Sequence, residues 1–137
     1  MARVYVTRVE RFNAAHKLWV DDWSEERNFE EFGKCANHNW HGHNYKLEVT
    51  VIGEPHPVKG FVIDAKYLGK IIRDIVVEKL DHKNLNLDVD FLQGIQPTSE
   101  NLAIKIWDLL LPHIEGCELY SIKLKETENI FIEYRGE

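Results

Sequence analysis

Hydrophobic and polar residues alternate along two stretches in the first half of the chain. In the clearer one, every second residue from position 41 to position 51 is apolar or aromatic: His41, His43, Tyr45, Leu47, Val49 and Val51. Side chains two apart on a strand share a face, so this period predicts a strand with one buried and one solvated face. Residues 3–16 show a similar alternation that is interrupted at Arg8 and Glu10, where we expect a bulge.

Three segments have the spacing and the end signals of helices. Residues 22–33 predict a short acidic helix with Asp22 as its N-cap and Gly33 at its end. Asp64 is placed to cap a helix of about 15 residues, because apolar residues recur at helical spacing after it. A third helix is predicted to open at Thr98.

The last part of the chain predicts a hairpin. Its strands are residues 117–126 and 129–135, joined at Thr127-Glu128-Asn129. A loop through residues 84–96 separates the last two helices. The order is then ββααββ, which predicts an α+β fold with an antiparallel sheet packed on two helices. At 137 residues, the chain has the length of one domain, 1–137.

The composition of the chain argues against several classes of function. Hydrophobic residues make up 44% and charged residues 29%, as in a globular protein. The 17 Lys and Arg against 23 Asp and Glu give a net charge of −6, which argues against nucleic acid as a partner. No apolar run approaches the roughly 18 residues of a membrane span. With two cysteines and no signal-peptide pattern, we expect a cytoplasmic protein.

His41 and His43 carry the strongest chemical signal. They are two residues apart on the predicted strand, so both imidazoles lie on its buried face. Burying imidazoles without partners is costly, and Zn²⁺ is the common divalent metal that best suits imidazole nitrogen. His16 has the parity of the buried positions in the first strand and becomes a third ligand if the two strands pair. Three histidines would leave the fourth tetrahedral position of Zn²⁺ open, as in a catalytic site.

Two further positions are candidates for proton transfer. Cys35 lies in a loop six residues before His41, and its thiol is a fourth zinc ligand, a nucleophile or base beside the metal, or inert. If Cys35 is a ligand, the chain is a structural zinc or ligand-binding module without catalysis. Asp81 precedes His82, and a carboxylate that touches an imidazole fixes its tautomer and raises its basicity.

Glu126 continues the apolar face that Tyr120, Ile122 and Leu124 form on their predicted strand. A carboxylate seldom lies on a buried face without a partner. Either the strand reaches solvent at this point, or the carboxylate accepts hydrogen bonds from a planar ligand rich in N–H groups.

Five motifs in chain order resemble those of the 6-pyruvoyl-tetrahydropterin synthase family. They are Phe12-Asn13-Ala14-Ala15-His16, Cys35 with His41-Gly42-His43-Asn44-Tyr45, Leu80-Asp81-His82-Lys83-Asn84-Leu85, Pro97-Thr98-Ser99-Glu100-Asn101, and Glu126-Thr127. The resemblance runs from the first strand to the final hairpin. It implies the tunnelling fold (T-fold), in which ββααββ subunits close a β-barrel through their sheet edges. It also implies a homohexamer, a dimer of trimers with active sites at subunit interfaces.

The resemblance implies a role for each candidate residue. His16, His41 and His43 would hold Zn²⁺, which binds the side-chain hydroxyls of 7,8-dihydroneopterin triphosphate. Triphosphate elimination and an internal redox rearrangement would then give 6-pyruvoyl-tetrahydropterin. Proton transfer would fall to Cys35 as thiolate and to His82 polarised by Asp81, with Asp81 and His82 both supplied by the neighbouring chain. Glu126, with Thr98 and Ser99, would bind the pterin.

A sister group with the same substrate, metal and pterin anchor is the 6-carboxytetrahydropterin synthases of the queuosine pathway. These enzymes expel acetaldehyde as well as triphosphate, and the spacing between their Cys and His motifs is often shorter. The five residues between Cys35 and His41 therefore favour the pyruvoyl product, with the carboxy product as the alternative. His38 and Trp40 stand where smaller residues are frequent, and Asn86 replaces a frequent Asp.

Overall fold

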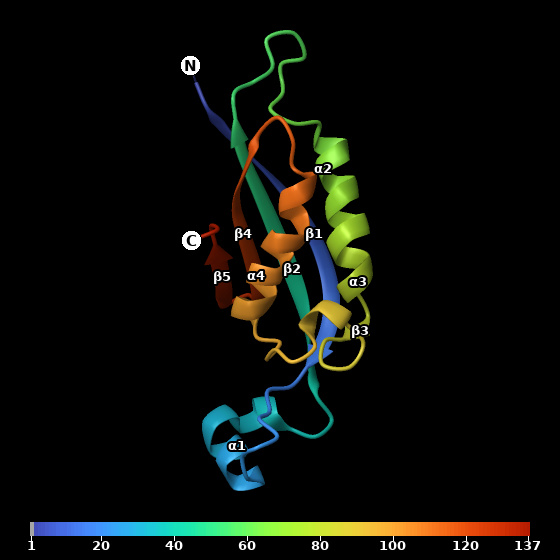
Figure 1. The fold of residues 1–137 in the computed structure, drawn as a ribbon, viewed down its shortest axis with the longest axis vertical. Helices are drawn as coiled ribbons and strands as arrows, with labels where there is room; N and C mark the ends of the chain where they lie inside the picture. The colour runs from blue at the N-terminus through green and yellow to red at the C-terminus, as the bar shows by residue number, and fades with distance from the viewer. Residues whose placement is uncertain (1) are drawn as a thin grey trace.

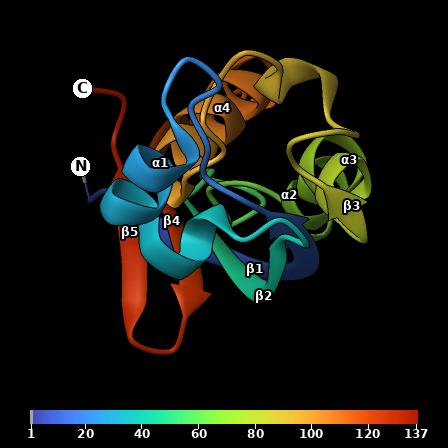
Figure 2. The ribbon, with the colours of Figure 1, turned by 90° about the horizontal axis from the view of Figure 1, so that it is seen from below.

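The computed structural model describes residues 2–137, and these form a five-stranded sheet in the order β3-β1-β2-β4-β5. The helical rod α2–α3 and helix α4 lie side by side over one face of this sheet (Figure 1, Figure 2). The strands are β1 Val4–His16, β2 His41–Gly53, β3 Lys83–Asn84, β4 Glu118–Thr127 and β5 Ile130–Tyr134. The helices are α1 Glu25–Phe32, α2 Ala65–Ile72, α3 Glu78–Leu80 and α4 Ser99–Leu110.

β1 and β2 form a long antiparallel ribbon through the middle of the sheet. Their register runs without a shift from Val4 opposite Gly53 to His16 opposite His41. The ribbon therefore runs along the whole length of the sheet (Figure 1). The predicted metal-binding histidines lie at one of its two ends.

The bulge expected at Arg8 and Glu10 is wrong, because both residues pair in register with β2. Their side chains interrupt the apolar face because they contact helix α2 and the turn after it. Glu10 accepts a hydrogen bond of 2.6 Å from Arg73. Arg8 packs on Gly69, where a Cβ atom would lie only 2.8 Å from the guanidinium carbon.

The two helices that cover the sheet begin where the sequence predicts. The Asp64 carboxylate accepts the Lys66 N–H at 2.9 Å, and the Thr98 hydroxyl accepts the Asn101 N–H at 3.2 Å. The rod that begins after Asp64 passes through a π-helical turn at Arg73–Val77 before α3 ends it. Hydrophobic spacing does not reveal this wider turn.

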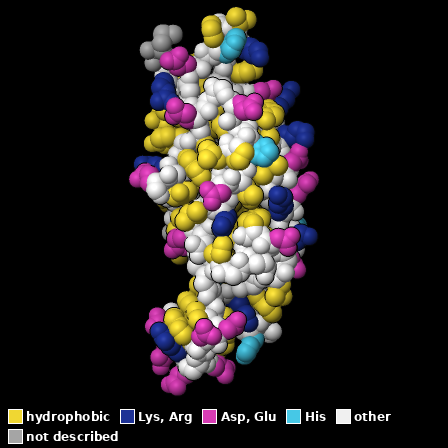
Figure 3. All heavy atoms as spheres, in the orientation of Figure 1, with side chains coloured by type: hydrophobic (Ala, Val, Ile, Leu, Met, Phe, Trp, Pro, Cys, Tyr) yellow, Lys and Arg dark blue, Asp and Glu magenta, His cyan; other side chains and the backbone are white. Residues whose placement is uncertain are grey.

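Helix α1 lies beyond the end of the sheet, at the bottom of Figure 1, and acidic side chains gather on it (Figure 3). The predicted N-cap at Asp22 is wrong, because the Ser24 hydroxyl accepts the Arg27 N–H at 3.1 Å. The predicted end is confirmed: Gly33 takes a positive φ of 56°, which glycine adopts more readily than other residues.

The sheet is mixed rather than wholly antiparallel. The loop expected over residues 84–96 overlaps a two-residue strand, β3, which pairs in parallel with β1 at Ala14 and Ala15. A 3₁₀ turn at Asp90–Leu92 follows it. Two residues are too few to give a periodic signal, so the sequence does not predict this strand.

β4 is irregular at both ends. Thr50 pairs with Ser121 and Val51 with Leu119, so Tyr120 is an extra residue, and Leu119 rather than Tyr120 lies on the buried face. At the other end, Lys125 and Thr127 both have partners on β5, whereas Glu126 has none. Bulges of this kind re-aim side chains next to functional sites.

The core lies between the sheet and the covering helices. Fully buried side chains come from both layers: Leu47, Val49, Ile122 and Leu124 from the sheet, and Leu68, Ile72, Leu102 and Ile106 from the helices. Within residues 2–137, the sheet is open, with β3 and β5 at its edges. None of the helices in this range has the length and apolar character needed to cross a membrane.

Candidate metal centre and active site

The structure brings together the three histidines that the sequence nominates as metal ligands. Pairing of His16 with His41 places the end of β1 against the start of β2, and His43 follows on the same face. The ligand nitrogens of the three side chains all lie within 4.8 Å of one another. The ring centroids are 4.5 to 5.1 Å apart.

The nitrogens of this cluster fit a divalent cation. Among the described residues, Nε2 of His16, Nε2 of His43 and Nδ1 of His41 are buried and have no hydrogen-bond partner. Nδ1 of His16 donates to the Pro97 carbonyl at 2.6 Å, which leaves Nε2 with a free lone pair, as in many metal-binding histidines. Burial lowers the pKa of all three imidazoles, so they favour the neutral form that binds metal.

Glu126 places a carboxylate beside two of the three histidines. Its Oε1 lies 3.3 Å from Nε2 of His43 and 3.5 Å from Nε2 of His16. Glu126 lies at the bulge near the end of β4 and has no partner on β5. Of the two explanations left open for Glu126, termination of the strand in solvent does not fit this position.

The segment that opens α4 lies against the histidines. The Pro97 carbonyl binds His16, and the hydroxyl oxygen of Thr98 is occupied by its helix-capping bond. The Ser99 hydroxyl is buried and has no partner in residues 2–137. Ser99 is therefore the member of this segment whose buried hydroxyl has both its donor and its acceptor capacity free for a ligand.

Cys35 lies in a half-buried 3₁₀ turn, Gly33–Ala36, that follows α1. Its backbone carbonyl accepts the Leu18 N–H at 2.7 Å, which ties this turn to the chain leaving His16. Within the described part of the chain, the cluster of potential metal ligands contains no sulfur atom. This geometry does not support Cys35 as the fourth zinc ligand.

Asp81 and His82 do touch. Nδ1 of His82 lies 3.0 Å from Asp81 Oδ2, and the other oxygen of Asp81 accepts the Asn13 N–H at 2.9 Å. This backbone hydrogen bond is the main reason that the pKa of Asp81 is lowered. The imidazole of His82 is 77% exposed and does not belong to the histidine cluster.

Amide side chains hold the chain after His16, a role that no local pattern in the sequence indicates. Asn86 accepts the N–H of Lys17 at 2.9 Å and donates to its carbonyl at 3.0 Å. An aspartate at this position would lack the donor, which explains the asparagine. Gln96 and Asn28 bind the backbones of Trp19 and Val20 in the same two-sided way.

The two unusual residues before His41 occupy different surroundings. His38 is mostly exposed, 3.8 Å from Glu25, and lies outside the histidine cluster. Trp40 adopts a positive φ of 58°, and the Lys17 ammonium lies 4.6 Å from the centre of its ring.

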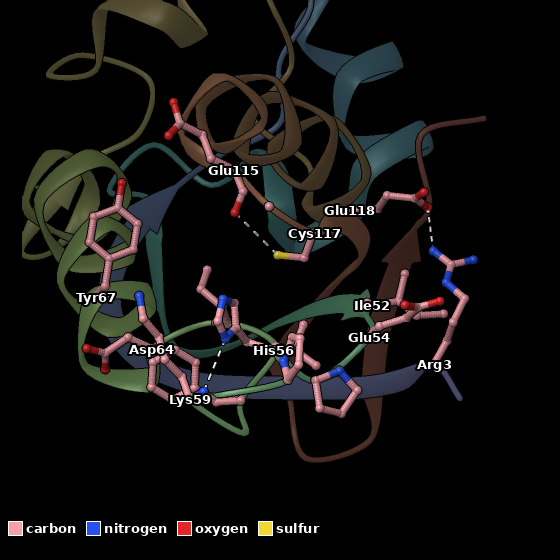
Figure 4. A pocket seen from close by; sticks show the side chains of 17 residues that line it. Arg3, Ile52, Glu54, His56, Lys59, Asp64, Tyr67, Glu115, Cys117 and Glu118 are labelled. Carbon is pink, nitrogen blue, oxygen red and sulfur yellow. Dashed lines mark hydrogen bonds and ion pairs between the residues drawn. The ribbon is translucent and has the colours of Figure 1, made fainter. Parts of the chain in front are cut away.

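A cavity of about 770 Å³ lies at the opposite end of the β1–β2 ribbon (Figure 4). Several of its polar groups have partners within the chain. Nδ1 of His56 accepts the N–H groups of Val58 and Lys59, and Arg3 pairs with Glu118 at 3.0 Å. This cavity is separate from the histidine cluster.

Comparison with known proteins finds relatives that match nearly the whole length of the chain. The family model described as 6-pyruvoyl tetrahydropterin synthase matches residues 5–137. A 6-pyruvoyl tetrahydrobiopterin synthase from Dictyostelium discoideum is 46% identical over 134 residues, 98% of this chain and 97% of that protein. One from Poecilia reticulata is 44% identical over 133 residues, 97% of this chain and 90% of that protein.

The structure of Caenorhabditis elegans 6-pyruvoyl tetrahydropterin synthase has a TM-score of 0.93 and 38% identity to this chain, and the match covers 100% of this chain and 98% of that one. The expected α+β T-fold is thereby confirmed for the subunit. The chain belongs to the 6-pyruvoyl tetrahydropterin synthase family of lyase enzymes.

Proposed function

We propose that this protein is a zinc-dependent lyase that converts 7,8-dihydroneopterin triphosphate to 6-pyruvoyl-tetrahydropterin with release of triphosphate. The observation that carries the proposal is the group of three buried imidazole nitrogens without hydrogen-bond partners in the described residues, in a chain of this family. Zn²⁺ held by His16, His41 and His43 would supply Lewis acidity, which stabilises negative charge developing on a substrate hydroxyl oxygen.

The chain's own residues move the protons. Cys35, as thiolate, takes the proton from the substrate carbon next to that hydroxyl. His82 serves as the second acid–base group, because Asp81 holds its Nδ1 and leaves Nε2 to exchange a proton with the substrate.

Other side chains fix the pterin. The carboxylate of Glu126 accepts hydrogen bonds from the N–H groups of the amino-pyrimidine edge, and a charged acceptor makes such bonds strong. The hydroxyls of Ser99 and Thr98 support this contact, and the unpaired hydroxyl of Ser99 favours it.

We also propose a cytoplasmic homohexamer, a dimer of trimers, in which His82 reaches the site of a neighbouring subunit. Its 77% exposed imidazole favours such a role. Large apolar side chains on the outer strands are exposed as well, with Ile130 at 52% and Phe131 at 53% on β5. Open sheet edges with exposed apolar groups favour pairing with another chain.

The test is to incubate the zinc-loaded protein with 7,8-dihydroneopterin triphosphate and to identify the products by mass spectrometry. We expect triphosphate and 6-pyruvoyl-tetrahydropterin. Acetaldehyde among the products would assign the chain to the 6-carboxytetrahydropterin synthases instead. Substrate that binds but is recovered unchanged would leave only a non-catalytic zinc- or pterin-binding module.

A further inference from the structure

The segment between β1 and β2, residues 17–40, is closed at its base by a contact between its first and last residues. Lys17 follows His16 and Trp40 precedes His41, so both lie one residue beyond the last pair of the β1–β2 ribbon. The Lys17 ammonium lies 4.6 Å from the ring centre of Trp40, a distance at which a cation is attracted to the face of an aromatic ring. The contact therefore joins the two strand ends at which the histidine cluster lies.

The surroundings of Lys17 and Trp40 favour this contact. No carboxylate within residues 2–137 pairs with the Lys17 ammonium, which also lies 5.4 Å from the ring centre of Trp19. Trp40 has a positive φ of 58°, a conformation that costs free energy in a residue other than glycine. Such a conformation persists where the surrounding contacts enforce it, and it is typical of functional sites. A tryptophan in this conformation therefore points to a role for the contact beyond packing.

Cys35 is connected to this contact from both sides. Its carbonyl accepts the N–H of Leu18, the residue after Lys17, at 2.7 Å. On the other side, the Trp40 N–H donates to the Asn37 carbonyl at 3.2 Å, which closes the turn that leads from Cys35 to β2. The position of the thiol relative to the histidines thus depends on how Lys17 and Trp40 lie against each other.

We infer that Lys17 and Trp40 are positioning residues, which hold the Cys35 thiol at the correct distance from a substrate bound at the histidine cluster. The inference rests on the proposed function, in which Cys35 takes a proton from the substrate. A displacement of about 1 Å at a reacting group can cost about 100-fold in rate. A contact that involves none of the reacting groups can therefore control turnover.

Substitutions on both sides of the contact test the inference. Lys17→Met and Trp40→Gly should each lower kcat by about 10- to 100-fold, whereas KM and Zn²⁺ affinity should stay close to those of the wild type, because other side chains bind the substrate and the metal. Lys17→Arg keeps a cation that can stack on the ring and should keep most of the activity. Arg27→Met is the matched control, because it removes a cation 3.9 Å from the ring centre of Trp23 in the same segment; it should match the wild type.

A double variant separates positioning from general structural damage. If the contact acts through Cys35, adding Lys17→Met to Cys35→Ala should lower kcat no further, since no thiol remains to be positioned. A further loss of about tenfold or more in the double variant would overturn the inference, because independent effects multiply. Failure of Lys17→Arg to retain activity would overturn it as well.

Alkylation of Cys35 by iodoacetamide, measured in Cys117→Ala protein, gives a readout that needs no turnover. Cys35 is half-buried, so Lys17→Met and Trp40→Gly should both raise the alkylation rate as the turn opens more often, whereas Lys17→Arg should not. Equal rates in all variants would overturn the inference. If these rates differ as expected but the wild-type protein leaves 7,8-dihydroneopterin triphosphate unchanged, the proposed function alone is overturned.

Discussion

The two ends of the β1–β2 ribbon carry similar polar side chains and differ in whether those side chains have partners. At one end, one ring nitrogen of each of the three clustered histidines is buried without a hydrogen-bond partner in the described chain. At the other end, His56 accepts two backbone N–H groups, Arg3 pairs with Glu118, and Asp64 caps α2. The cavity of about 770 Å³ lies at this second end.

This difference shows that the volume of a cavity does not by itself indicate where the functional site lies. A buried polar atom without a partner costs free energy, so a fold retains a group of them where a ligand provides the missing contact. At the cavity end, these groups already have partners, and they stabilise the loop and the helix start. A ligand is therefore expected to gain the most binding free energy at the histidine end.

The largest expected effect comes from replacing a histidine of the metal cluster, and the matched control replaces a histidine at the other end of the ribbon. His41→Ala should lower Zn²⁺ affinity by more than about 100-fold and abolish lyase activity, because it removes a ligand rather than an outer partner of one. His56→Ala should keep full metal content. Chelator competition and metal analysis after dialysis measure both. Stoichiometric zinc in His41→Ala would show that the site lies elsewhere.

The second largest effect is expected from replacing Cys35, with Cys117 as its control. Cys35→Ala should slow turnover by about 10²- to 10⁴-fold, the usual contribution of a general acid or base, and should keep its zinc. Cys117→Ala, at the cavity end, should keep its activity. Steady-state rates and zinc content are measured on the same samples. Loss of zinc together with thermal stability in Cys35→Ala would support the structural-module interpretation.

The smallest effect is expected from Asn86, whose side chain holds the segment that follows His16. Asn86→Asp should lower the free energy of unfolding by about 1–3 kcal/mol, because the Lys17 carbonyl loses its donor. Asn129→Asp makes the same substitution at an exposed turn and should change little. Urea unfolding of the metal-free proteins measures both. Equal stability of the two variants would mean that the Asn86 side chain does not stabilise the segment after His16.

The local features of this protein can be predicted from its amino-acid sequence alone. Alternation placed His41 and His43 on one face, and cap residues marked where the two covering helices begin, at Asp64 and Thr98. These signals lie within a few neighbouring residues, because helix and strand periods and capping bonds act over short separations. The five motifs in order also identified the family, which the comparisons confirmed.

The features that join distant segments become visible only once the chain is folded. The contact of Glu126 with the histidines, the two-sided bonds from Asn86 to Lys17, and the strand β3 beside β1 all depend on elements far apart in the chain. The unbroken register at Arg8 belongs with them, since its polar side chain packs on helix α2. A local pattern does not encode such contacts, because they depend on strand register, on bulges and on the packing of helices against the sheet.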